Sequence, residues 1–222
     1  MAKIFFTSDL HFSHKNIAKF CPAFRPATNH IEELDEFMIA RWNETVSPED
    51  VVYNLGDVSF AREFRQVEGV LYRLNGTHHL IYGNHDQEIR QHIERLKNMP
   101  KHDGLPMLSS AQDYLKIKLT EINKTLILFH YPIYEWDGCH KGWYHLHGHI
   151  HDRVAEIQGR ILNVGWDLHG RFLTEQDIHQ LLENLPVKSH FGEKSEQFPL
   201  SDVHVNQAFL RQKMEIINGI NG

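Results

Sequence analysis

The sequence predicts a mixed α/β fold, and three features lead to that prediction. In the first half of the chain, apolar strand-like runs alternate with segments of helical periodicity, whereas the second half consists mostly of strand-like runs. The chain has 222 residues, a length that fits one sizeable domain. Its hydrophobic fraction of 41% is enough to fill the core of such a domain.

Three strands and three helices are expected in the first half. KIFFTSD is typical of a buried strand that ends in polar residues. NHIEELDEFMIARWNE has apolar residues at positions 31, 34, 37, 38 and 42, the spacing of an amphipathic helix, and Asn29 can cap it. In chain order we expect a strand at 3–9, a helix at 29–44, a strand at 51–55, a helix at 60–74, a strand at 78–83 and a helix at 86–98.

The second half is expected to contain four more strands and two helices. DYLKIKL and KTLILFH alternate on either side of Glu121-Ile122-Asn123, which indicates a hairpin. Thr174 is placed to cap a helix that ends near Asn184. We expect strands at 113–119, 124–130, 143–148 and 160–165, a helix at 174–184, an irregular polar stretch at 186–202 and a last helix at 203–217. Residues 1–185 then form the domain, and 186–222 form an appendage without assigned chemistry.

Composition excludes several classes of function. The net charge is −6 and no Lys/Arg-rich run occurs, so binding to long nucleic acid is not expected. Cys21 and Cys139 lie far apart and outside any CxxC pattern, which favours a reducing cytoplasm over a disulfide framework. The apolar run before Thr7 is too short for a signal peptide, and no run is long enough to span a bilayer. We expect a cytoplasmic protein with no membrane partner.

Acidic, amide and histidine residues occur where the expected strands end. In α/β sheets, ligands gather beyond the carboxyl ends of the strands. Carboxylate oxygen, amide oxygen and imidazole nitrogen together suit divalent ions such as manganese, iron, cobalt, nickel or zinc, and no thiolate is available for a structural zinc site. Glycines before several of these residues allow sharp turns. The residues are Asp9, His11, Asp57, Asn84, His85, Asp86, His130, His149 and His151.

The stretch YHLHGHIHD holds four alternating histidines. In one unbroken strand their period of two would point all four to the same face, as a four-histidine metal site requires. Gly148 divides the stretch. We assign His145 and His147 to the strand, where packing or support of a ligand is expected, and His149 and His151 to the metal site.

The series Asp9-x-His11, Gly56-Asp57, Gly83-Asn84-His85-Asp86, His130 and Gly148-His149-x-His151 resembles the calcineurin-like metallophosphoesterase superfamily. All five blocks occur in order over residues 9–151. The resemblance implies a four-layer α-β-β-α sandwich of two mixed sheets flanked by helices. It also implies two divalent ions, with manganese expected first and iron, nickel, cobalt or zinc as alternatives. One ion would be held by Asp9, His11, Asp57 and His151, and the other by Asp57, Asn84, His130 and His149.

This resemblance implies a metal-dependent phosphoesterase in which a metal-bridging hydroxide attacks phosphorus. His85 would be the catalytic histidine that protonates the leaving oxygen, and Asp86 would orient its ring. Two carboxylates against two divalent cations leave a positive cluster, so phosphate is attracted although the whole chain is acidic. The expected substrate is a small phosphate ester, and a nucleotide-like ester is one of the possibilities. Monoesters, diesters, cyclic nucleotides and pyrophosphates all remain open.

Two other hypotheses are weighed against it. A non-catalytic scaffold of the same fold would bind a partner at the metal face. Loss of His85 would favour this scaffold, but His85 is present. A metallo-β-lactamase-type hydrolase wants HxHxDH early in the chain, whereas here DxH is early and GHxH is late.

Several further residues near these blocks receive only minor roles. A solvated loop is expected for His14, Lys15 and Asn16, with pocket lining as the alternative. For Trp136, Trp143 and Trp166 we expect packing, with stacking on a nucleobase as the alternative. Asn163, Trp166 and Asp167 could shape the substrate side, and His78 and His79 have no assigned role.

Overall fold

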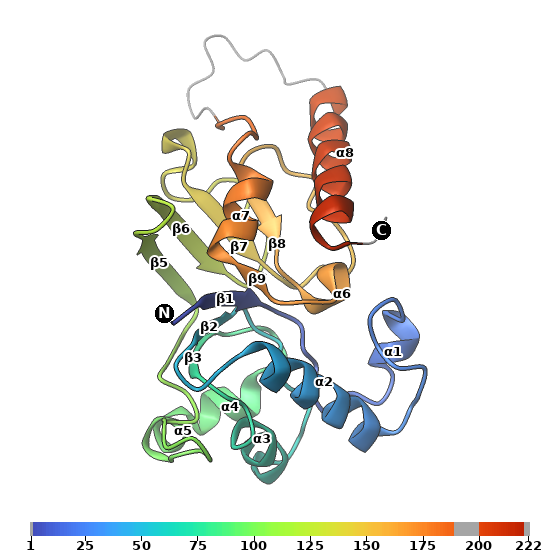
Figure 1. The fold of residues 1–222 in the computed structure, drawn as a ribbon, viewed down its shortest axis with the longest axis vertical. Helices are drawn as coiled ribbons and strands as arrows, with labels where there is room; N and C mark the ends of the chain where they lie inside the picture. Colours follow the sequence, from blue (N-terminus) through green and yellow to red (C-terminus); the bar gives the residue numbers. More distant parts are fainter. Residues whose placement is uncertain (1, 189–199, 220–222) are drawn as a thin grey trace.

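The computed structural model describes residues 2–188 and 200–219 as a mixed α/β fold with two mixed sheets (Figure 1). The first sheet has the strand order β4-β3-β2-β1-β9. Strands β1 to β4 run parallel to one another, and β9 is antiparallel to β1. The carboxyl ends of β1, β2 and β3 therefore meet at one edge. The strands are β1 (Ile4–Thr7), β2 (Val51–Asn54), β3 (Thr77–Ile81), β4 (Ser110–Gln112) and β9 (Leu173–Thr174).

The second sheet has the order β5-β6-β7-β8. Its first two strands form the expected antiparallel hairpin, while β6, β7 and β8 run parallel. The carboxyl ends of these three strands also meet at one edge. The strands are β5 (Tyr114–Leu119), β6 (Lys124–Phe129), β7 (Tyr144–His147) and β8 (Ile161–Asn163).

Alternation along β1 links the two main hydrophobic clusters. Phe5 packs with Trp42 of helix α2 (Ile31–Thr45) and with Leu71 of helix α3 (Phe64–Leu71) on one face of the first sheet. Phe6 points the other way and shares a cluster with Leu128 and Leu146 of the second sheet. Burying apolar side chains on both faces is what a parallel sheet requires. The two sheets are thus joined by a common core.

Two helices complete the second cluster. Thr174 caps helix α7 (Glu175–Leu182). Its hydroxyl accepts a hydrogen bond from the Asp177 N–H, and the Asp177 carboxylate accepts one from the Thr174 N–H. This capping box confirms the expected cap. Helix α8 (Leu200–Ile217) confirms the expected last helix and buries Leu210 and Met214 in the same cluster. The irregular stretch expected at 186–202 lies mostly outside the described residues, and the division at residue 185 stays a prediction.

The other differences from expectation are local. The helix expected at 86–98 is interrupted at His92 and forms two helices, α4 (Gln87–Gln91) and α5 (Ile93–Asn98). The His92 ring stacks on Phe64, with 4.3 Å between the ring centroids. Asn29 was wrong as a cap, because α2 begins after His30 and no side chain caps it. Three further short helices were not expected: α1 (Ile17–Phe20), η1 (Cys139–Lys141) and α6 (Trp166–His169). No helix in the described ranges is long and apolar enough to cross a membrane.

Candidate metal centre

The nine predicted site residues follow the carboxyl ends of five strands, β1, β2, β3, β6 and β7. The parallel β1–β3 bring the residues of the first sheet to one edge. A hydrogen bond between the His149 N–H and an Asp9 carboxylate oxygen, at 3.0 Å, joins the loop after β7 in the second sheet to the loop after β1 in the first. The site therefore lies where the two sheets meet.

The predicted ligands have an unusual backbone. Seven described residues other than glycine have positive φ, and five of them are predicted ligands: Asp9, His11, Asp57, His149 and His151. The remaining two are Ser13 and Asn123. Left-handed conformations cost about 1 kcal/mol or more for residues with a Cβ, and they gather at functional sites. The strained backbone positions are therefore mostly those of the residues predicted to bind metal.

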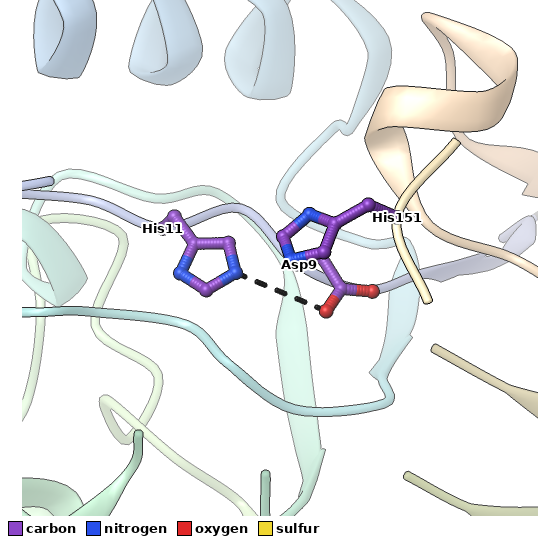
Figure 2. Close-up of side chains that lie close together, drawn as sticks. All are labelled: Asp9, His11 and His151. Atoms are coloured by element: carbon purple, nitrogen blue, oxygen red, sulfur yellow. Dashed lines mark ion pairs between the residues drawn. The ribbon is translucent and has the colours of Figure 1, made fainter. Parts of the chain in front are cut away.

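Asp9, His11 and His151 form the first group of potential ligands. One ligand atom from each lies within 4.8 Å of the other two, and the three side chains converge (Figure 2). The His11 Nε2 atom is 3.9 Å from an Asp9 oxygen and 3.8 Å from an Asp57 oxygen. Asp57 thus borders this group as well as the next one.

Asp57, His130 and His149 form the second group, again with ligand atoms within 4.8 Å of one another. The Asp57 Oδ2 atom is 3.4 Å from the His130 Nε2 atom. The amide oxygen of Asn84 lies 3.2 Å from His130 Nε2 and 3.0 Å from His149 Nδ1. The structure thus brings the predicted ligands together around two groups, with Asp57 bordering both.

The state of His11 fits a bound cation. Both ring nitrogens are buried and have no hydrogen-bond partner among the described residues. Buried polar atoms without a partner are rare in proteins, and such an atom is often satisfied by a bound ion or water. Burial lowers the pKa of His11 to about 3, so the ring is neutral and offers a lone pair.

The carboxylates of Asp9 and Asp57 differ in how far neighbouring positive charge offsets the effect of burial on their pKa values. Burial raises the pKa of Asp9 to about 6, against the lowering effect of His130 and His151. Burial also raises the pKa of Asp57, but the hydrogen bond and charge of His130 outweigh it and lower this pKa to about 2. Asp9 therefore lacks a sufficient positive partner in the protein itself, which a divalent cation would supply.

Two glycines permit close approach to these carboxylates. A Cβ at Gly83 would lie 2.2 Å from an Asp57 oxygen, and a Cβ at Gly148 would lie 1.9 Å from the Ser8 Oγ atom and 2.5 Å from an Asp9 oxygen. Only glycine leaves room at such distances. The glycine that divides YHLHGHIHD is thus required by contact with Asp9.

His85 lies beside the ligands without belonging to either group. Its backbone N–H donates to an Asp57 oxygen at 2.8 Å, and its half-buried ring is 5.7 Å from the His11 ring between centroids. It also lines a cavity next to the site. This position suits a proton donor to a substrate better than a metal ligand.

Asp86 has a different geometry from the one expected. We expected its carboxylate to orient the His85 ring, but its oxygens accept backbone N–H groups of Asp57, Val58 and Gly83 at 2.8–2.9 Å. No hydrogen bond joins it to the His85 ring within residues 2–188. Asp86 instead fixes the two loops that carry Asp57 and Asn84 against each other.

A buried chain of three residues behind the first group was not foreseen. His151 Nδ1 lies 2.8 Å from one oxygen of Asp167, and Arg25 Nε donates to the other at 2.7 Å. The same guanidinium donates to the carbonyls of Asp9, at 2.8 Å, and Leu10, at 3.0 Å. Asp167 follows a strand, a signal we assigned to the substrate side, whereas no sequence pattern marks Arg25. Arg25 and Asp167 thereby join the loop of Asp9 to the ring of His151.

Cys21 lies beside His151 and Asp167. Its sulfur forms a third group with His151 and Asp167. Burial raises the pKa of the thiol to about 12, so it remains protonated, and Arg25 already occupies Asp167. Cys139 is likewise buried.

The two strand histidines of YHLHGHIHD lie outside both groups. His145 is buried, with Nδ1 3.1 Å from the Ile127 carbonyl and Nε2 3.2 Å from the Tyr131 carbonyl. His147 is also buried, and its Nδ1 atom lies 2.8 Å from the Gly148 carbonyl. The hydrogen-bond partners of both rings are backbone groups, whereas the buried Nε2 atom of His147 has no partner among the described residues.

The residues given minor roles divide between packing and the cavity. Trp136 and Trp166 are buried, and Asn163 donates to the carbonyls of His151 and Arg153. His14 lines the cavity beside His85, whereas Lys15 and Asn16 are exposed. His78 is buried against Trp42, away from the predicted ligands.

The chain is similar to several known proteins whose names state no activity. No family model matches the chain. It is 41% identical over 88 residues to the uncharacterized protein MJ1445 of Methanocaldococcus jannaschii, a match that covers 39% of this chain and 48% of that protein, so the match spans about half of that relative. It is 28% identical over 212 residues to the Gene 66 protein of Mycobacterium phage D29, covering 83% of this chain and 98% of that protein.

A protein of unknown function from Aquifex aeolicus, AQ665, has a similar solved structure. The TM-score is 0.60 at 21% identity, with 82% of this chain and 100% of that chain covered. At this identity the similarity concerns the fold, which supports the α/β class described above.

Proposed function

We propose that the chain is a metal-dependent phosphoesterase of the calcineurin-like metallophosphoesterase superfamily, with the four-layer arrangement of that fold. The observation that carries the proposal is the pair of ligand groups around Asp57, which combine strand ends of both sheets and in which five of the six residues have a left-handed backbone. Two divalent cations, manganese first among those expected, would be held by Asp9, His11, Asp57 and His151 and by Asp57, Asn84, His130 and His149. We place the protein in the cytoplasm.

When bound, such a pair of cations would activate water and neutralise charge on a phosphoryl group. The chain's own residues would do the rest. His85 lies beside both groups and next to the cavity, where its ring can give a proton to the leaving oxygen of an ester. Asp86 would keep the loops of Asp57 and Asn84 at fixed separation, because its carboxylate accepts N–H groups from both. Arg25 would hold the loop of Asp9 to Asp167, the partner of the His151 ring.

A substrate panel with each metal in turn tests this function. Phosphomonoesters and phosphodiesters would be assayed with manganese, nickel, cobalt, iron and zinc on the wild type and on Asp57→Asn. We expect the substitution to reduce kcat/KM at least 100-fold, because Asp57 serves both groups. Asp137→Asn is the matched control, since this half-exposed carboxylate pairs with Lys116 and belongs to neither ligand group.

The role of His85 is tested separately. His85→Ala should lower kcat about 100-fold or more while leaving the affinity for metal within a factor of three, because the ring belongs to neither ligand group. Calorimetric titration with Mn²⁺ measures the affinity. Metal-loaded wild type that hydrolyses no ester would contradict the enzyme and favour the partner-binding scaffold.

A further inference from the structure

A cavity of about 280 Å³ opens beside the candidate metal centre. One side is formed by His11, His85 and His151, which are ligands or catalytic residues in the proposed function. Ile17 and Phe20 of the short helix α1 also line the cavity. A group attached to a phosphate at the metal centre would enter this cavity.

Aromatic rings lie in and beside the lining of the cavity. His14 and Phe20 line it, with their ring centroids 6.1 Å apart. Phe60 lies outside this lining, 4.7 Å from the His85 ring and 4.3 Å from the His14 ring between centroids. Phe20 is 63% exposed although it is one of the largest apolar side chains. A ring this exposed at the edge of the cavity is available to stack on the flat face of a ligand.

Two polar groups accompany these rings. The Nδ1 atom of His14 accepts from the Asn16 N–H at 3.2 Å, which leaves Nε2 to carry the proton as a donor. Arg153 also lines the cavity, and its Nε donates to the Ile150 carbonyl at 3.3 Å. No contact within the described residues uses its Nη atoms, so they can donate to an anionic oxygen. Asp152 is the one carboxylate in this lining and is exposed.

We propose that this cavity binds a planar aromatic group of the substrate, an aryl ring or a nucleobase, which stacks on Phe20 beside His14. The proposal rests on the proposed phosphoesterase function and names the substrate class of that site. The volume is slightly below the usual range of ligand pockets, about 300–1,000 Å³, and suits one ring system. Stacking on an aromatic side chain tolerates different rings, so the chemistry recognised is the flat face.

Matched substrates separate the ring from the ester. Phenyl and n-butyl phosphates, as monoesters and as methyl diesters, would be compared on the wild type, Phe20→Ala and Phe20→Tyr. We expect Phe20→Ala to lower kcat/KM for phenyl esters about 5- to 100-fold, mainly through KM, and to change butyl esters less than threefold. Phe20→Tyr keeps an aromatic ring and should retain the wild-type activity on phenyl esters. Tyr72→Ala, which removes an exposed aromatic outside the cavity, is the control.

A binding measurement keeps the inference independent of turnover. Titration of metal-loaded His85→Ala with adenosine 5′-monophosphate and with ribose 5-phosphate distinguishes a nucleobase from a simple aryl group. Preference for the nucleotide, lost in the double variant with Phe20→Ala, supports a nucleobase; phenyl selectivity without that preference supports an aryl group. Equal losses on phenyl and butyl esters, or no loss on either, would overturn the inference. If wild type hydrolyses none of the esters, the proposed function fails, and the titration alone decides whether the cavity binds a ring.

Discussion

Asp167 shows how much a single buried carboxylate can contribute to a site without touching the reacting atoms. It holds the ring of His151 through one oxygen and is held by Arg25 through the other. Partners of this kind set the orientation and tautomer of a metal-binding histidine. Its side chain is fully buried, so little solvent competes for these hydrogen bonds.

Asp167→Asn should weaken metal binding at the group of Asp9, His11 and His151. An amide oxygen is a weaker acceptor than a carboxylate and leaves Arg25 without its counter-charge, so we expect the Kd for Mn²⁺ at one of two sites to rise about 10- to 100-fold. Calorimetric titration checks this, with Asp137→Asn as the exposed control. An unchanged Kd for both sites would show that Asp167 has no positioning role.

At the scale of elements, strand ends and glycines decide where the site residues lie. The order of strands and polar residues was predictable, since each block follows an apolar run, and the predicted ligands do converge in two groups. Arg25 was not predictable, because its partner Asp167 is 142 positions away in the sequence and the pairing depends on tertiary structure. The short helices α1 and α6 were missed because four residues show no periodicity.

Gly148→Ala should disrupt the junction between the two sheets. The added methyl group would lie 1.9 Å from the Ser8 Oγ atom, so we expect a loss of about 2 kcal/mol or more in the free energy of unfolding. Gly69→Ala in helix α3 is the matched control, because its Cβ would meet nothing within 4 Å and alanine favours a helix. Urea denaturation of both variants measures the difference. Equal stability of the two variants would contradict the close approach.

At the scale of the whole molecule, buried neutral histidines link the fold to pH. Four of them belong to neither ligand group, and burial lowers the pKa of each: His78 and His147 to about 3, and His145 and His169 to about 4. In the unfolded chain they titrate near pH 6.5. The unfolded state therefore binds more protons than the folded state between pH 6.5 and about 4, and stability falls as the pH falls.

We accordingly expect the metal-free protein to lose stability steeply below pH 6.5. The raised pKa values of Asp9 and Asp86, both about 6 through burial, act in the opposite direction, because the folded state then holds protons that the unfolded state has released. Four histidines with larger shifts outweigh two carboxylates. Guanidinium denaturation at pH 7.5, 6.5, 5.5 and 4.5 tests the balance. A free energy of unfolding that stays constant or rises toward pH 4.5 would contradict it.

The left-handed backbone of the predicted ligands implies a conflict between folding and function. At His149, with φ of 70°, glycine would fit the backbone more easily than histidine does. His149→Gly should therefore cost the metal-free protein little stability, or raise it, while removing one imidazole from the second group. Aspartate or histidine stands at all five left-handed positions among the predicted ligands, so the residues placed for a metal site are not the ones that fit this backbone best.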